Sequence, residues 1–200
     1  MRLNSGEFYV QDESSGVRVV SEPYLLTEGD LLQVAGWLYL SDSGEFMMRA
    51  TKVWQLSHGP PPVPRLVTLT DAHAGRYQGQ LVAVRGSVLN VNFGSEFDSL
   101  SIQSGRRSLR AFYAANHHGL SAFEQIYPGM QVALTGISVP QTADPEFDGY
   151  QVRLRSAADL AIRPALSDYR ASPPLVPWAG GISLVLAGAV AWRWSSRATG

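Results

Sequence analysis

The sequence contains no cysteine, and Lys52 is the only lysine among its 16 basic residues. Without cysteine there are no disulfides, thiolate metal ligands or cysteine nucleophiles. This absence leaves the compartment open, because a periplasmic protein can also do without disulfides. The formal net charge of the 200 residues is −1, which predicts no global attraction to nucleic acid or to anionic lipid.

Motifs of the common enzyme classes are absent too. The sequence has no G-x-S-x-G motif, P-loop, dinucleotide fingerprint or zinc signature. We therefore expect no enzymatic activity and no cofactor. The first thirty residues contain no basic region followed by an apolar run, so no signal peptide is visible.

Helical patterns are scarce between residues 1 and 165, and strand patterns dominate. GDLLQVAG at 29–36 returns as GQLVAVRG at 79–86 and as GMQVALTG at 129–136. The alternation of apolar residues in each copy predicts a strand with one face in a core. The glycine that ends each copy predicts a bulge or a sharp bend.

The apolar phase changes after the second copy. Val82 and Val84 give way to Leu89, Val91 and Phe93, a shift that a β-bulge produces. One exception to the strand pattern is GLSAFEQIYPG at 119–129, where Ser121 predicts the cap of a short helix that ends before proline.

A second repeat predicts the fold. FYVQDESSGVRV at 8–19 aligns with LSIQSGRRSLRA at 100–111, and both patterns indicate hairpins. The second copy then has five strands, with a short helix between the third and the fourth. This order predicts an all-β, five-stranded oligonucleotide/oligosaccharide-binding (OB)-like barrel.

The first copy lacks its opening strand, because residues 1–7 are too short to supply one. Such a barrel would have an unpaired edge and an open core. Two explanations fit this pattern. The gene product is truncated, with a signal peptide and a first strand upstream, or another part of the chain completes the barrel. We favour truncation, because it also explains the missing export signal.

The C-terminal segment is apolar. LVPWAGGISLVLAGAVAW at 175–192 would span about 27 Å as a helix, close to the hydrocarbon thickness of a bilayer. We predict a transmembrane helix over 175–194; the alternative is a buried core helix. The predicted membrane-interface residues are Trp178, Trp192, Arg193, Trp194 and Arg197.

The arginines after the apolar run orient the predicted span. The positive-inside rule puts the C-terminus in the cytoplasm and residues 1–170 outside. We therefore expect a single-pass protein of a bacterial inner membrane with a periplasmic N-terminal part. The small residues Ser183, Ala187 and Ala191 form a row that suits a helix homodimer.

These patterns divide the chain into six parts. The predicted boundaries are 1–57 for a first OB-like domain, 58–74 for a Pro-rich linker, 75–164 for a second OB-like domain, 165–174 for a juxtamembrane linker, 175–194 for the transmembrane helix and 195–200 for a cytoplasmic tail.

The arrangement resembles the tandem OB-like extracytoplasmic region of bacterial membrane-bound sensor proteins, histidine kinases and diguanylate cyclases among them. The matching stretches are the first hairpin with its GD-x-x-x-V-x-G strand, the link GPPPVPRLVTL, GQLVAVRGSV, and YQVRLRSAADLAIRP before the apolar run. The resemblance implies ligand sensing and a kinase or cyclase as cytoplasmic partner. Only eight residues come after Trp192, so we expect any transmitter domain to be missing or encoded separately.

The strongest candidate binding residues lie on the second hairpin. Arg106, Arg107 and Arg110, with Tyr113, are predicted to face a polar or anionic ligand, since this part of an OB barrel carries ligand contacts. Phe112 and Tyr113 are neighbours and must point to opposite faces, so at least one belongs to the core. The alternative is a solvated hairpin tip.

Two further clusters contain residue types that can bind metal ions. His117 and His118 are adjacent, and His58 and His73 lie elsewhere, so three converging ligands are not predicted. Carboxylates alternate in TADPEFDG, but the calcium loop with its distal glutamate is missing. That acidic set comprises Asp144, Glu146 and Asp148, and an acidic hairpin turn is the better interpretation. We predict no metal.

The sequence therefore predicts a membrane-anchored binding or sensor module of a bacterial envelope receptor, with an unknown small ligand or envelope protein as its partner. One alternative is an anchored structural or adhesion module. Another is a single-stranded nucleic-acid binder, which the acidic first hairpin QDESSG disfavours.

Overall fold

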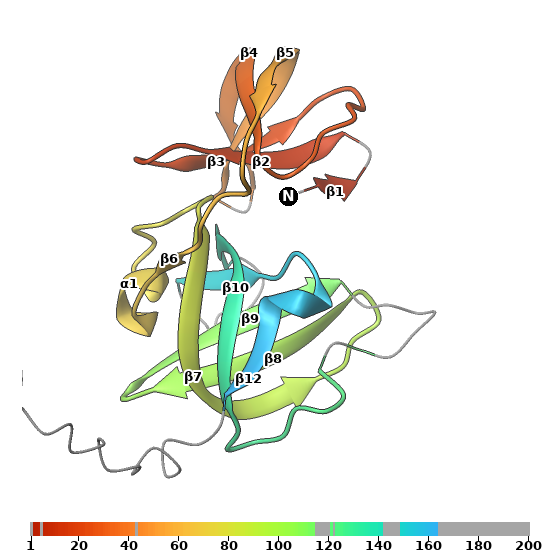
Figure 1. The fold of residues 1–200 in the computed structure, drawn as a ribbon. Helices are drawn as coiled ribbons and strands as arrows, with labels where there is room; N and C mark the ends of the chain where they lie inside the picture. Colours follow the sequence, from red (N-terminus) through yellow and green to blue (C-terminus); the bar gives the residue numbers. More distant parts are fainter. Residues whose placement is uncertain are drawn as a thin grey trace, which may run out of the picture. The chain divides into compact units, whose positions relative to one another are not determined.

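The protein is known from a computed structural model that describes residues 2–4, 6–42, 44–114, 121, 123–141 and 149–163. Its strands form two sheets (Figure 1). The first sheet contains β1 (Arg2–Asn4), β2 (Glu7–Gln11), β3 (Gly16–Val20), β4 (Asp30–Leu40) and β5 (Phe46–His58). The second contains β6 (Arg65–Leu66), β7 (Leu81–Asn92), β8 (Phe97–Ser104), β9 (Arg107–Ala114), β10 (Gln131–Pro140), β11 (Tyr150–Arg153) and β12 (Leu160–Arg163).

The second sheet closes into a barrel. β7, β8 and β9 follow one another as antiparallel neighbours, β11 pairs with β9 in parallel, and β10 pairs with both β11 and β7. With β11 as the fifth strand, the order around the barrel is 1-2-3-5-4-1, the closed order of an OB barrel. The predicted all-β, OB-like class is confirmed for this part of the chain.

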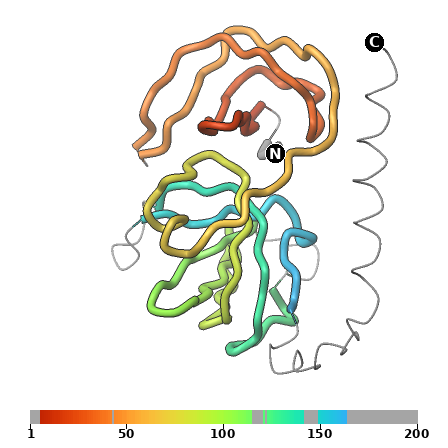
Figure 2. Tube along the Cα trace, turned by 60° about the vertical axis from the view of Figure 1, so that its left-hand side comes forward, coloured from red at the N-terminus to blue at the C-terminus, as the bar shows by residue number. Residues whose placement is uncertain are grey.

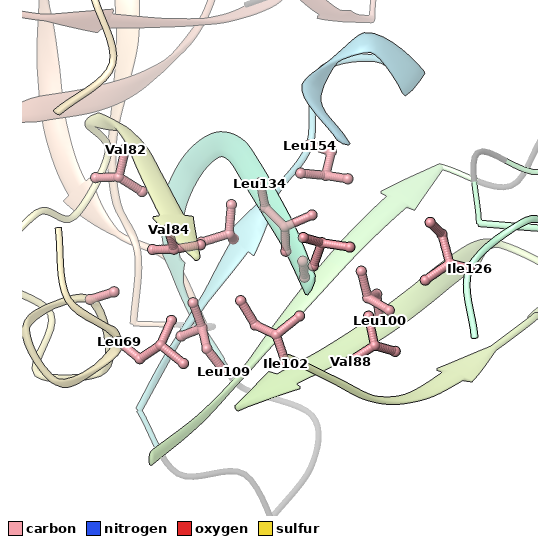
Figure 3. Close-up of a cluster of buried hydrophobic side chains, with 14 of the residues drawn as sticks. Leu69, Val82, Val84, Val88, Leu100, Ile102, Leu109, Ile126, Leu134 and Leu154 are labelled. Atoms are coloured by element: carbon pink, nitrogen blue, oxygen red, sulfur yellow. The ribbon is translucent and has the colours of Figure 1, made fainter. Parts of the chain in front are cut away.

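Alternate residues of these strands fill the barrel. Sixteen buried hydrophobic residues form one cluster, and β7 contributes Val82, Val84 and Val88 to it. Figure 3 shows these valines in the same cluster as Leu134 of β10 and Ile102 of β8. The period-two burial explains why the apolar alternation identified the strands.

The last strand of the barrel is broken. β11 pairs with the second half of β10 and β12 with its first half. Between them lies the one-turn 3₁₀ helix η1 (Ala157–Asp159). Asp159 Oδ2 accepts hydrogen bonds from the backbone N–H of Arg155 (2.8 Å) and of Ser156 (3.2 Å), which holds the break in place.

The three repeated glycines share one packing role. A Cβ at Gly36 would lie 2.3 Å from the carbonyl oxygen of Arg49, one at Gly86 2.7 Å from that of Gln103, and one at Gly136 2.4 Å from that of Arg153. In each case the backbone of a neighbouring strand fills the position of a side chain. Glycine therefore returns in each copy because only glycine allows this approach.

The first sheet has a related but incomplete order. Its strands lie in the order β1-β2-β3-β5-β4, and β3 pairs with β5 in parallel, as β9 does with β11. β4 and β5 pair along their whole length, and Figure 2 shows them as two long orange tubes side by side. The order is that of an OB barrel that is not closed, because the opening strand β1 has only three residues and does not pair with β4 among the described strands.

A buried polar network holds this first sheet together. The Tyr9 hydroxyl donates to Glu45 Oε1 (2.5 Å), and Arg18 forms ion pairs with Glu45 (3.2 Å) and Glu7 (2.6 Å). Burial, and then the charge of Glu45, raise the pKa of Tyr9 well above its ordinary value. Two acidic side chains of this domain therefore serve the packing of the sheet.

The structure corrects two secondary-structure predictions. In the stretch 119–129, the described residues 121 and 123–129 form turns instead of a helix, and Phe123 and Ile126 close the barrel as buried plugs. A helix occurs instead within the segment predicted as a linker. This helix, α1 (Leu69–His73), begins at Thr68, whose side chain accepts from Asp71 N–H.

The predicted bulge is present, but its position differs. The register between β7 and β8 shifts between Val88 and Asn90, so Leu89 is the extra residue. Val88 is buried, whereas Leu89 and Phe93, which the sequence placed in the core, are exposed. Only Val91 of the predicted second set packs on the barrel core.

The predicted transmembrane helix at 175–194 and its interface residues Trp178, Trp192, Arg193, Trp194 and Arg197 lie outside the described residues. Within the ranges that the structure does describe, no helix has both the length and the apolar character needed to cross a bilayer.

Candidate ligand-binding face

The second barrel carries an uneven distribution of charge. Its strands β7–β12 contain five arginines and one acidic residue, Asp98. Asp98 is buried and accepts hydrogen bonds from Ser121 Oγ (2.5 Å) and from Gly94 N–H (3.3 Å). The strands therefore present positive charge to solvent without a compensating carboxylate of their own.

The strand register brings some of these arginines toward one outer face. Gln131 of β10 is opposite both Arg163 of β12 and Ser87 of β7, and Ser87 is opposite Gln103 of β8. The residues of this row alternate along their strands with the buried Val132 and Ile102, so their side chains point outward. Arg85 lies two residues before Ser87 on the same outward phase and is exposed.

Two arginines lie at the β8–β9 turn, Arg106 within the turn and Arg107 at the start of β9. Arg106 and Arg107 follow Gly105, whose φ of +61° is the left-handed conformation that the turn requires. Both arginines are exposed. Among the described residues, no carboxylate forms an ion pair with Arg85, Arg106, Arg107 or Arg163.

The four predicted binding residues are not brought together as one set. Arg110 points outward from β9 and donates to Ser99 Oγ (3.3 Å). Tyr113 lies on the opposite phase of the same strand and packs against the barrel core. Arg110 therefore lies on the outer face, whereas Arg106 and Arg107 lie at the exposed end of the hairpin, where Arg107 is on the strand phase of Leu109. Tyr113 is separated from Arg110 by the sheet.

Phe112, the neighbour of Tyr113, belongs to the outer face but is not free to stack on a base. Its ring forms an edge-to-face pair with Phe97 at 5.5 Å, and Arg153 lies 5.7 Å from the ring centroid. Burial lowers the pKa of Arg153 below its ordinary value. The side chains of Phe97, Phe112 and Arg153 therefore pack against one another, and Phe112 is not available for stacking.

The candidate metal residues do not converge in the described part of the chain, where no three histidine or acidic side chains could hold a metal ion. His58 is engaged with Asp30 at 2.8 Å. His117, His118, Asp144, Glu146 and Asp148 lie outside the described residues.

Asp30 fixes the start of β4. Its carboxylate accepts from Thr27 N–H (2.7 Å), from Gln55 Nε2 (2.9 Å) and contacts His58 Nδ1 (2.8 Å). The hydrogen bond from Thr27 N–H, followed by that from His58, lowers the pKa of Asp30 below its ordinary value. These hydrogen bonds therefore favour the ionised carboxylate of Asp30 in the folded state.

A pH dependence follows from this shift. Because the pKa of Asp30 is lower in the folded than in the unfolded state, its contribution to stability is present above about pH 4 and is lost as the pH falls through the folded pKa. We expect Asp30→Asn to be less stable than the wild type at pH 6 and the difference to shrink below pH 4. Urea unfolding between pH 2 and 6 measures it, with the exposed Asp42→Asn as control. A difference that does not change with pH would contradict this role.

Comparison with known proteins gives structural matches only. No family model and no curated protein matches the chain. An OBody bound to hen egg-white lysozyme has a TM-score of 0.42 and 11% identity, covering 50% of this chain and 96% of its own. A putative aspartyl-tRNA synthetase from Leishmania major Friedlin has a TM-score of 0.42 and 9% identity over 54% of this chain.

The asparaginyl-tRNA synthetase from Pyrococcus horikoshii has a TM-score of 0.39 and 20% identity over 48% of this chain. The matched region spans 22% of each of the two synthetase chains. At these TM-scores and identities the matches carry no functional argument. The barrel assignment rests on the strand order itself.

Proposed function

We propose that this chain is a binding module, without catalysis, that takes an anionic ligand on the outer face of its second barrel. The observation that supports the proposal most directly is a set of exposed arginines on the strands and the β8–β9 turn of this barrel, whose strands contain a single acidic side chain, which is buried. These arginines are Arg85, Arg106, Arg107 and Arg163. Unpaired guanidinium groups on a rigid sheet are well suited to phosphate, sulfate or carboxylate groups, because their donors are fixed in a planar fork.

The neighbouring side chains support recognition of a polar ligand. Ser87, Gln103, Ser108 and Gln131 lie on the same outward rows and offer neutral donors and acceptors. Placing the site on strands rather than on a long loop keeps the groups in fixed positions. The first domain offers no comparable face, because its hairpin turn carries Asp12 and Glu13.

Binding of polyanions to the full chain tests this proposal. The probes are inorganic polyphosphate and a twelve-residue oligothymidylate of similar charge, each followed by fluorescence anisotropy at several salt concentrations. We expect Arg106→Ala/Arg107→Ala to weaken polyphosphate binding at least about tenfold and to reduce the salt slope by about two. Arg49→Ala/Lys52→Ala removes the same charge from exposed positions of the first barrel and should change neither value.

The outcomes separate the candidate functions. Binding of both probes with loss in Arg106→Ala/Arg107→Ala supports an anion site. Binding of oligothymidylate alone would favour a single-stranded nucleic-acid module. The observation that supports this second candidate is the same basic face of an OB-like barrel. A folded chain that binds neither probe would contradict the proposal and favour an anchored structural or adhesion module.

The cellular setting that we propose is the extracytoplasmic side of a bacterial inner membrane, as part of an envelope receptor with a cytoplasmic kinase or cyclase partner. The support is the apolar run 175–192 and the resemblance to sensor proteins. A reporter fused after Gly200 and another inserted at 144–149, in a chain given a signal peptide, map the topology. We expect a cytoplasmic C-terminus and an external loop; the reverse orientation would contradict the receptor.

A further inference from the structure

The first barrel has a strand edge that the second barrel does not have. β10 of the second barrel is paired on both sides, with β7 on one edge and with β11 and β12 on the other. β4, its counterpart in the repeat, pairs with β5 alone among the described strands. One edge of an eleven-residue strand is thus left without a β partner.

The repeat shows which part of β4 lacks its partner. Aligning the glycines at 29 and 129 makes Leu31–Trp37 equivalent to Gln131–Ile137. Gln131–Ile137 pairs antiparallel with Leu81–Ser87 of β7, from Gln131 opposite Ser87 to Ile137 opposite Leu81. The chain therefore contains its own template for the strand that would pair with β4.

Side-chain burial along this edge agrees with a missing neighbour. Val132 and Leu134 are 1% and 0% exposed, whereas Leu32 and Val34 at the equivalent positions are only half-buried. The core cluster of the first barrel contains three buried residues, Phe8, Val19 and Val53, against sixteen in the second. On the outer side, Leu31 is 58% exposed.

The opening lies where a first strand would pass. Phe8–Gln11 of β2 and Asp30–Leu32 of β4 line one common cavity, to which Leu81, Ile137 and Arg155 of the second barrel also contribute. In the second barrel the bent strand β7 crosses between the equivalent strands, since Ser87 pairs with both Gln131 and Gln103. An open seam between β2 and β4 is the expected result when that strand is absent.

The short strand β1 gives the direction and register of the missing partner. Arg2 pairs antiparallel with Phe8, and Phe8 is equivalent in the repeat to Leu100, which pairs with Val91 near the end of β7. β1 thus occupies the place of the last residues of an opening strand. In this register, a strand that pairs with β4 would be joined to the N-terminal side of β1.

We propose that the free edge of β4 is an acceptor site for an extended strand that is joined to the N-terminal side of β1 and runs antiparallel to Leu31–Trp37. The accepted strand has the sequence features of Leu81–Leu89. These are apolar side chains at alternate positions that face Leu32 and Val34, a glycine where the strand bends, and no proline. Such a strand adds main-chain hydrogen bonds to the edge and covers the open core.

A nine-residue extension tests this site on the full chain. A copy of Leu81–Leu89 is placed directly before Met1, and a control extension has aspartate in place of its three valines. With the copy, we expect the midpoint of thermal unfolding of the first barrel to rise by at least about 8 °C. Hydrogen exchange of the unpaired amides of Leu31–Trp37 should slow at least about a hundredfold, and the protein should remain monomeric. The aspartate control should show neither change.

The other outcomes would overturn the proposal. No protection of β4 by the copied strand, or equal protection by the aspartate control, would show that this edge does not accept the strand. If the unextended chain already protects these amides and sediments as a dimer, the edge is covered by a second copy. These results do not depend on Arg106 or Arg107, so the anion-binding proposal stands or fails separately.

Discussion

Leu134→Ala is expected to destabilise the second barrel by about 3 kcal/mol, and Leu32→Ala the first by about 1 kcal/mol or less. Leu134 is fully buried among the residues of a closed barrel, so its removal leaves a cavity that rigid strands cannot fill. Leu32 occupies the same strand of the first barrel but is half-buried beside an open seam. Removing the methyl groups of Leu32 therefore loses less buried apolar contact area than removing those of Leu134, and water fills the space that they leave.

Chemical denaturation followed by far-ultraviolet circular dichroism measures both losses of stability. The two losses can be compared directly, because the same substitution is made on equivalent strands of one chain. Val82→Ala on the neighbouring strand of the second barrel serves as an additional core reference, with an expected loss of about 2 kcal/mol. Equal losses for Leu134→Ala and Leu32→Ala would mean that the first barrel is as well packed as the second.

Gly136→Ala is expected to cost about 3 kcal/mol, the upper part of the range for inserting a methyl group into a packed site. The new Cβ would lie 2.4 Å from the carbonyl oxygen of Arg153 and 2.7 Å from Val152 Cγ1. Both atoms belong to the neighbouring strand, so β10 and β11 would have to separate where the barrel closes.

The control for this prediction is Gly59→Ala, where the nearest atom to a new Cβ is the carbonyl oxygen of Gly29 at 3.8 Å. That substitution should change the free energy of unfolding by less than about 0.5 kcal/mol. Thermal and urea unfolding of both variants give the comparison. If Gly136→Ala is as stable as Gly59→Ala, the close approach of the strands is not what selects glycine in the repeat.

The repeat made much of the fold predictable from the sequence. Three copies of a glycine-ended strand and two copies of a hairpin were enough to predict OB-like strand order, because the alternation of buried residues follows directly from the pleat. The sequence predicts no opening strand in residues 1–7, whereas the structure has a three-residue strand β1 there, which pairs with β2 and leaves β4 at the edge of the sheet.

Local signals failed where tertiary contacts decide the conformation. Ser121 predicts the cap of a short helix that ends before proline, but the described residues of this stretch form no helix, and Phe123 and Ile126 are buried in the barrel core. The helix α1 escaped notice because it has only five residues and follows a proline-rich stretch. Leu89 was assigned to the core because a bulge shifts the phase by one residue, and the sequence does not say at which residue the shift occurs.

The candidate site was predictable only in part. Arg106, Arg107 and Arg110 are close in sequence and share one hairpin, so they could be found by reading along the chain. Arg85 and Arg163 join the same barrel face through the pairing of β10 with β7 and β12, a long-range register that the sequence alone does not give. Tyr113 was included although its alternation with Phe112 places it on the core side.

Amide hydrogen exchange of the full, unextended chain is the most direct test of a closed second barrel beside an open first one. For the amides of Gln131–Leu134 and Ile137, where β10 is paired on both edges, we expect at least about a thousandfold protection. In Leu31–Trp37 only the amides that pair with β5 should be protected, and the alternate amides on the free edge should exchange near the unprotected rate. Uniform protection of both strands in a monomeric protein would contradict the account.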